Sequence, residues 1–130
     1  MNRVVHFEIH AEEPERAVDF YSKVFGWAIK KWEGVDIDYW VIDTGLRTTP
    51  GINGGLFKRK GPAPKDGQAV NAYVCTMDVA NADDMVKKVE AAGGSVAVPK
   101  KALFGLGWLV YCKDTEGNIF GMMQNDPQAK

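Results

Sequence analysis

The sequence predicts an α+β fold built from two tandem βαβββ modules. Two glycines that end helix-like stretches, Gly26 and Gly93, are 67 residues apart, and the first strand-like stretches of the two halves are separated by about the same distance. The order strand, helix and three strands occurs once before and once after a segment rich in Gly and Pro. We therefore expect repeats at about residues 1–60 and 68–126 of one domain spanning 1–130, with curved sheets around a cleft.

The first repeat begins with alternating apolar and polar residues over 4–10, the pattern of a strand with one polar face. His6 and Glu8 fall on that polar face. Pro14, which follows two acidic residues, suits the first position of a helix, and Gly26 suits its end. Apolar residues between them recur at helical spacing. Three further strands are predicted at residues 27–32, 38–43 and 52–58.

The second repeat follows a predicted linker over residues 61–67, which is dense in Gly and Pro. Asn81 is a suitable helix N-cap, with Asp84 three residues later, and Gly93-Gly94 suits the end of that helix. Strands are predicted at residues 71–77, 95–98, 108–112 and 118–124.

Composition and charge exclude several classes of protein. The 130 residues carry a net charge of −1, and the basic runs Lys58-Arg59-Lys60 and Lys100-Lys101 are short, so we interpret them as solvated loop charge and expect no nucleic-acid partner. No stretch approaches the ~18 apolar residues of a membrane span, and the N-terminus lacks the pattern of a signal peptide. Cys75 and Cys112 both lie in apolar strand-like stretches without a CxxC motif, which predicts buried free thiols in the cytoplasm.

Several segments together resemble the glyoxalase/bleomycin-resistance/extradiol dioxygenase (vicinal oxygen chelate) superfamily, and in particular its branch of lactoylglutathione lyase-related proteins. The resemblance covers nearly the whole chain, and it is specific because the segments occur in the family's order. They are His6-Phe7-Glu8-Ile9, Pro14-Glu15-Arg16-Ala17-Val18-Asp19-Phe20-Tyr21, Phe25-Gly26-Trp27, Gly54-Gly55-Leu56-Phe57, Val89-Glu90-Ala91-Ala92-Gly93-Gly94 and Asp114-Thr115-Glu116-Gly117-Asn118-Ile119-Phe120-Gly121.

Metal enzymes of this superfamily place His, Gln or Glu ligands on the first and fourth strands of each module, so the resemblance implies where ligands would stand. His6 occupies the first of these positions. The fourth-strand positions fall at Gly54 and Gly121, and the first strand of the second repeat offers Ala72 or Tyr73. A lone imidazole holds a divalent ion poorly. We therefore expect no tightly bound metal and no cofactor.

His6 and Glu8 are the candidate catalytic residues, because a histidine and a carboxylate on one strand face could act as an acid–base pair. A structural hydrogen bond or ion pair is the alternative. Trp40, Gly54, Trp108 and Gly121 are the candidate ligand-binding residues. Aromatic residues also favour strands for packing alone, and a strand glycine can mark a bulge or a tight strand crossing.

The leading hypothesis is a glyoxalase-like protein that binds an unidentified small organic molecule in the cleft between its sheets. One alternative is a metal-assisted lyase, isomerase or dioxygenase that uses His6 with substitute ligands. Another is a non-catalytic, drug-sequestering module of the bleomycin-resistance type, which would need a more acidic cleft than Glu8 alone supplies. Whether the chain is an enzyme stays open. The resemblance also implies a homodimer.

Overall fold

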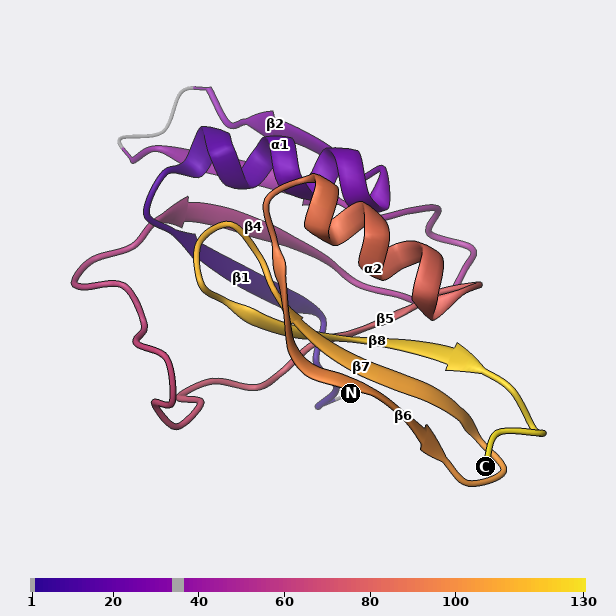
Figure 1. The fold of residues 1–130 in the computed structure, drawn as a ribbon. Coiled ribbons are helices and arrows are strands. Elements are labelled where there is room, and N and C mark those ends of the chain that lie inside the picture. The colour runs from indigo at the N-terminus through magenta and orange to yellow at the C-terminus, as the bar shows by residue number, and fades with distance from the viewer. Residues whose placement is uncertain (1, 34–36) are drawn as a thin grey trace. The chain divides into compact units, whose positions relative to one another are not determined.

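The computed structural model describes residues 2–33 and 37–130, which form two compact units at residues 1–63 and 64–130. Each unit contains one helix and one four-stranded mixed sheet, and in each the helix lies over one face of the sheet (Figure 1). The predicted α+β class and the repeated βαβββ order are therefore confirmed. The boundary between the units falls within the predicted linker. That the two repeats make a single domain stays a prediction.

The first unit has the strand order β1-β4-β3-β2, in which β1 and β4 are parallel and the other pairs antiparallel. Because the edge strand β1 pairs in parallel with β4, the chain must cross over the sheet between them, and α1 lies in that crossover. The elements are β1 (His6–Ala11), α1 (Pro14–Phe25), β2 (Ala28–Lys31), β3 (Tyr39–Asp43) and β4 (Asn53–Lys58).

Helix α1 begins and ends where local chemistry requires. Pro14 occupies its first turn, where a missing backbone N–H costs nothing. Gly26 ends it in the left-handed conformation, with φ of 72°, and its N–H donates to the carbonyl of Ser22. One stripe of the helix is buried, so its packing on the sheet, rather than helix propensity, supplies most of its stability.

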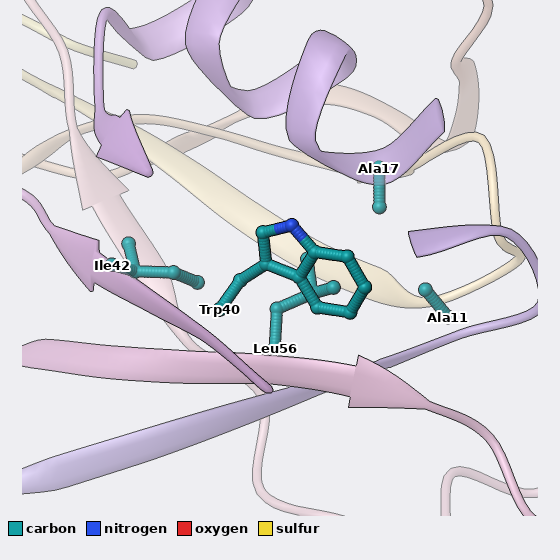
Figure 2. Packing of buried hydrophobic residues seen from close by; sticks show 5 residues of the cluster. All are labelled: Ala11, Ala17, Trp40, Ile42 and Leu56. Carbon is teal, nitrogen blue, oxygen red and sulfur yellow. The ribbon is translucent and has the colours of Figure 1, made fainter. Parts of the chain in front are cut away.

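The core of the first unit lies between α1 and one face of its sheet. Ala11, Ala17, Trp40, Ile42 and Leu56 form one buried cluster there (Figure 2). Figure 2 shows the indole of Trp40 directly below the helix that carries Ala17. This face of the sheet is therefore filled by the protein itself. We call the opposite face of each sheet its helix-free face.

The second unit repeats this arrangement with the strand order β5-β8-β7-β6, in which β5 and β8 are parallel. The side-chain oxygen of Asn81 accepts a hydrogen bond of 2.9 Å from the N–H of Asp84, which confirms the predicted N-cap. The elements are β5 (Thr76–Asp78), α2 (Ala82–Ala91), β6 (Ser95–Leu103), β7 (Gly107–Lys113) and β8 (Ile119–Asn125).

Two strands of the second unit differ from the prediction. The strand expected over 71–77 begins only at Thr76, as the short strand β5. Ala72 and Tyr73 therefore lie outside any strand, and Tyr73 is fully exposed. The strand expected over 95–98 continues to Leu103, through Pro99. Register shifts occur there, which is how an edge strand accommodates a residue that cannot donate a ladder hydrogen bond.

The two cysteines lie in different environments. Cys112 on β7 is buried, as predicted, and burial followed by the nearby Glu90 carboxylate raises the pKa of its thiol to about 11. Cys75 precedes β5 and is exposed, so the prediction of a buried thiol is wrong there. Its apolar neighbours in sequence had suggested a strand packed on the core, but β5 starts only after it.

No helix among the described residues is long and apolar enough to cross a membrane.

Candidate functional site

Strand β1 presents its polar side chains on the helix-free face of the first unit. Phe7 and Ile9 point to the core, whereas His6 and Glu8 are exposed. Strict alternation along a strand requires this division. The prediction that His6 and Glu8 share a polar strand face is therefore confirmed.

The central contact of this face joins His6 on β1 to Tyr39 on β3. The Nε2 atom of His6 lies 3.1 Å from the hydroxyl oxygen of Tyr39. Strand β4 separates β1 from β3, so the phenol must cross β4 to reach the imidazole. It crosses at Gly55, where a Cβ atom would lie 1.7 Å from the Tyr39 hydroxyl oxygen. Glycine at position 55 is therefore what permits the contact.

Volume, not backbone conformation, explains glycine at this position. Gly55 is absent from the glycines with positive φ, so its backbone is open to any residue. A glycine inside a strand otherwise weakens the strand and often marks a site that another group approaches closely. Here the approaching group is the side chain of Tyr39. The helix-free face thus has a gap at Gly55, and a phenol fills it.

Aromatic rings form a row across the sheet beside this gap. Tyr39 pairs with Phe57 in register, and their rings are stacked with centroids 6.1 Å apart. Phe57 pairs with His10, at a ring distance of 4.3 Å. Trp32, which follows β2 and is 55% exposed, meets Tyr39 edge-on at 6.0 Å. Each of the four strands, or its immediate extension, therefore contributes one ring, which gives the face an apolar surface for flat molecules.

The electrostatics of this face keep the phenol of Tyr39 protonated. Partial burial, and secondly the carboxylate of Glu8, raise the pKa of Tyr39 above its ordinary value of 10.0. Both effects oppose formation of a phenolate. The carboxylate of Glu8 lies 3.8 Å from the Nε2 atom of His10, and both side chains are 47% exposed. The predicted pair His6 and Glu8 is thus divided between two contacts, with Tyr39 beside His6 and His10 beside Glu8.

Two predicted ligand-binding residues of the first unit lie on the opposite, helix-covered face. Trp40 is 6% exposed within the core cluster, so it packs the fold and cannot line the face that carries His6. Gly54 pairs with Phe7, and a Cβ atom there would lie 2.5 Å from the carbonyl oxygen of Phe7. The expected position for an inward glycine was wrong by one residue, and a shift of one residue along a strand exchanges the two faces.

The two predicted ligand-binding residues of the second unit also lie on different faces. Gly121 is on the helix-free face, between Thr76 and Tyr111, which are its partners on either side. Trp108 has the same strand parity as the buried Val110, on the face that packs on α2. Its indole N–H donates to Asp126 at 3.0 Å. We therefore retain Gly121, but not Trp108, among residues that could meet a ligand.

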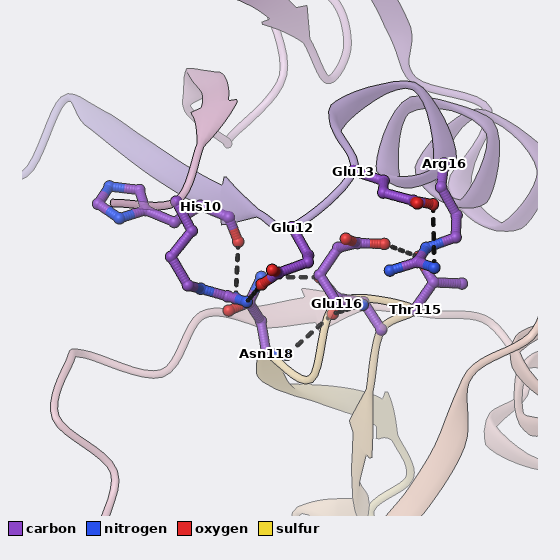
Figure 3. A network of polar contacts seen from close by, with 9 residues as sticks. His10, Glu12, Glu13, Arg16, Thr115, Glu116 and Asn118 are labelled. Atoms are coloured by element: carbon purple, nitrogen blue, oxygen red, sulfur yellow. Dashed lines mark hydrogen bonds and ion pairs between the residues drawn. The ribbon is translucent and has the colours of Figure 1, made fainter. Parts of the chain in front are cut away.

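A second polar group surrounds the end of β1. The guanidinium of Arg59 donates to the carbonyl of His10 at 2.9 Å and lies 3.5 Å from the carboxylate of Glu12, while Glu13 pairs with Arg16 at 3.1 Å (Figure 3). The side chain of Arg59 is only 10% exposed. Its interpretation as solvated loop charge is therefore wrong, because it closes the turn between β1 and α1. These contacts therefore stabilise the fold.

The donor set on the His6 face does not fit a tightly held metal. Residues 2–33 and 37–130 contain no group of three or more His, Cys, Asp or Glu side chains placed to hold an ion. Nε2 of His6 faces a phenol, and Gly55 and Phe57 on the neighbouring strand offer no ligand atom. Asn53, which pairs with His6, has its side-chain oxygen occupied by hydrogen bonds from Thr44. A divalent ion needs three or more protein ligands for firm binding. We therefore derive no chemical step through a metal.

Sequence reasoning overlooked Tyr39 and Gly55 as the partners of His6. Tyr39 falls only within the strand predicted at residues 38–43, and Gly55 only within the Gly54-Gly55-Leu56-Phe57 segment that carries the family resemblance. One signal was available: Trp40 and Ile42 share strand parity with each other, so Tyr39 had to face the opposite side. What the sequence lacked was the register of β3 and β4.

Comparison with known proteins agrees with this architecture. The family model described as Glyoxalase/Bleomycin resistance protein/Dioxygenase superfamily matches residues 3–122, so the chain belongs to this superfamily. Among curated proteins, none gives a significant match. Members of the superfamily bind small molecules, often with a metal.

Three similar solved structures show the same fold. A hypothetical protein from S. aureus is 21% identical, with 95% of this chain and 98% of that chain covered and a TM-score of 0.69. TioX from Micromonospora sp. ML1 is 19% identical, with coverages of 96% and 100% and a TM-score of 0.65. The fosfomycin resistance protein FosX from Listeria monocytogenes, in a complex with Mn(II) and 1S,2S-dihydroxypropylphosphonic acid, is 10% identical, with coverages of 97% and 94% and a TM-score of 0.74. At these identities the likeness concerns the fold alone.

Proposed function

We propose that this chain binds a small organic molecule on the helix-free face of its first unit, at His6 and Tyr39, without a tightly held metal. The observation that carries the proposal is the contact between these two side chains across Gly55. It combines hydrogen-bonding groups with exposed aromatic surface, the combination typical of small-molecule sites. Membership of a superfamily whose members bind small molecules supports it.

The exposure of the surrounding residues supports the same proposal. Val41, which pairs with Gly55, is 44% exposed, and Trp32 is 55% exposed. Contiguous exposed apolar surface with polar residues at its rim is typical of binding sites. The helix-covered face offers nothing comparable, because Trp40 and Leu56 fill it.

The test is a fragment screen of metal-free protein by ¹H–¹⁵N NMR. A binding fragment should shift the amides of His6 and Gly55 in a saturable manner, and His6→Ala should weaken that binding. Lys30→Ala is the matched control, because Lys30 pairs with Val41 on the same face but is exposed at the sheet edge. A broad screen in which no fragment moves these amides would refute the proposal.

A proton-transfer function is the second candidate, because the Tyr39 hydroxyl lies 3.1 Å from Nε2 of His6. The raised pKa of Tyr39 keeps the hydroxyl neutral and able to donate a hydrogen bond to a bound molecule, while His6 can accept a proton. Glu8 would act only through its charge. If a screening hit is converted, His6→Ala should lower turnover by about 10²–10⁴-fold. Unchanged turnover in that variant would eliminate this function.

We also propose that the chain works in the cytoplasm as a homodimer. Two unpaired cysteines support a reducing compartment, and the dimer rests on the resemblance to the superfamily. Sedimentation velocity measures the oligomer directly, and a species at the 14.3 kDa mass of one chain would contradict the dimer.

A further inference from the structure

We propose that the gap at Gly55 is a subsite for a phenol-type ring. The side chain of Tyr39 occupies this subsite in the free protein and is displaced when a ligand binds. This inference rests on the proposed function and specifies one part of the ligand. The gap now holds a phenol whose hydroxyl meets His6 and whose ring stacks on Phe57. A ligand that presents the same groups would find every one of these partners already in position.

The fit is defined by three contacts from two neighbouring strands, β1 and β4. Gly55 supplies the floor, since a Cβ atom there would overlap the phenol at 1.7 Å from its oxygen and 2.1 Å from Cζ. Phe57 supplies a parallel wall, with an interplanar angle of 20° to the ring of Tyr39. His6 supplies the polar end, at 3.1 Å. Together they select a flat ring that carries a hydroxyl, rather than an apolar ring of similar size.

The tyrosine can leave because it is fixed only on the outer side of the sheet. Its ring contacts Trp32, which is exposed, and Phe57, which is half-buried, and its hydroxyl contacts His6, which is exposed. All three partners lie on the helix-free face, whereas its neighbour Trp40 belongs to the core cluster below α1. Rotation of Tyr39 about its own side-chain bonds would uncover Gly55 without any change in strand pairing.

The helix-free face of the second unit provides an internal comparison. Gly121 lies beside Tyr111 there, and a Cβ atom at Gly121 would lie 3.3 Å from Cε1 of that ring. The nearest polar side chain to that Cβ position is the hydroxyl of Thr76, at 2.9 Å, rather than an imidazole. The tyrosine is present but the histidine is absent, so Tyr111→Ala is a matched control for Tyr39→Ala.

The experiment is a titration of p-cresol, the isolated side chain of tyrosine, into wild type, Tyr39→Ala and Tyr111→Ala, followed by NMR of the His6 ring and the Gly55 amide. We expect saturable shifts of both signals in Tyr39→Ala, weaker shifts with toluene, and no such shifts in Tyr111→Ala beyond those of wild type. In wild type, p-cresol should act at higher concentration and should move the Tyr39 ring signals. Adding Gly55→Ala to Tyr39→Ala should abolish binding, because the new methyl group fills the gap.

Three outcomes would overturn the proposal. These are no saturable shift in folded Tyr39→Ala, equal binding of toluene and p-cresol, or a Tyr39 ring in wild type that stays in place up to the solubility of p-cresol. If Tyr39→Ala does not fold, Tyr39→Leu, which keeps apolar volume beside Phe57, takes its place. If a non-phenolic fragment shifts the His6 signals and p-cresol does not bind, the phenol subsite is refuted and the proposed function still stands.

Discussion

Alanine substitution at two adjacent glycines, Gly54 and Gly55, distinguishes the helix-covered face of β4 from its helix-free face. At Gly54 a new Cβ would lie 2.5 Å from the backbone oxygen of Phe7 and 2.7 Å from its ring, on the buried side. Neither strand can yield without loss of the parallel β1–β4 pairing. Overpacking of this kind typically costs about 1–3 kcal/mol, which we expect as the loss in free energy of unfolding.

Gly55→Ala should cost much less. The group that it meets is the far end of the Tyr39 side chain, which can swing away. Losing one exposed hydrogen bond costs about 0.5–1.5 kcal/mol. Replacing a glycine whose backbone suits any residue returns about 0.4–1 kcal/mol, because the unfolded chain loses freedom. The two terms nearly cancel, so the net change should be less than about 1 kcal/mol.

Two measurements on each variant show which face of β4 its glycine lies on. Urea unfolding followed by circular dichroism gives the free energy of unfolding, and NMR of the His6 ring reports its contact with Tyr39. Gly54→Ala should be destabilised with its His6 signals unchanged, whereas Gly55→Ala should be near wild type in stability with shifted His6 signals. The reverse pattern would show that Gly54, as the sequence suggested, faces the site, and would refute the register argument.

Three further predictions concern packing, capping and pH. Trp40→Ala should lower the free energy of unfolding by about 3–5 kcal/mol because it empties the core below α1, whereas Trp32→Ala on the exposed face should cost far less; equal losses in chemical denaturation would contradict the assignment of faces. Asn81→Ala should cost about 1 kcal/mol through loss of the cap on α2, as measured by urea unfolding, and an unchanged midpoint would mean that the cap contributes nothing. The folded-state pKa of Cys112 is raised from 9.0 to about 11, so its contribution to stability is complete below pH 9 and is lost as the pH rises toward 11. The midpoint of thermal unfolding should therefore fall more steeply with pH over that range in wild type than in Cys112→Ala. Equal slopes in the two proteins would argue against Cys112 as the origin of the pH dependence.

The sequence by itself determined the fold class and most of the elements. Period-two and period-3.6 patterns are local properties, and so are the caps at Pro14, Gly26 and Asn81, so they can be recognised without tertiary information. The polar face of β1, with His6 and Glu8, followed from the same alternation. The elements and caps depend only on residues a few positions apart, and the fold class follows from the repetition of their order along the chain, which is why the sequence was sufficient for them.

Only the tertiary structure decided which residues meet His6. Tyr39 is 33 residues away in sequence, and its contact depends on how β3, β4 and β1 align. A register error of one residue exchanged Gly54 for Gly55, because successive strand residues face opposite sides. Burial of Trp40 and Arg59 was likewise set by packing partners from other elements. Strand alternation defines two faces, but only the pairing of distant strands shows which residues share one.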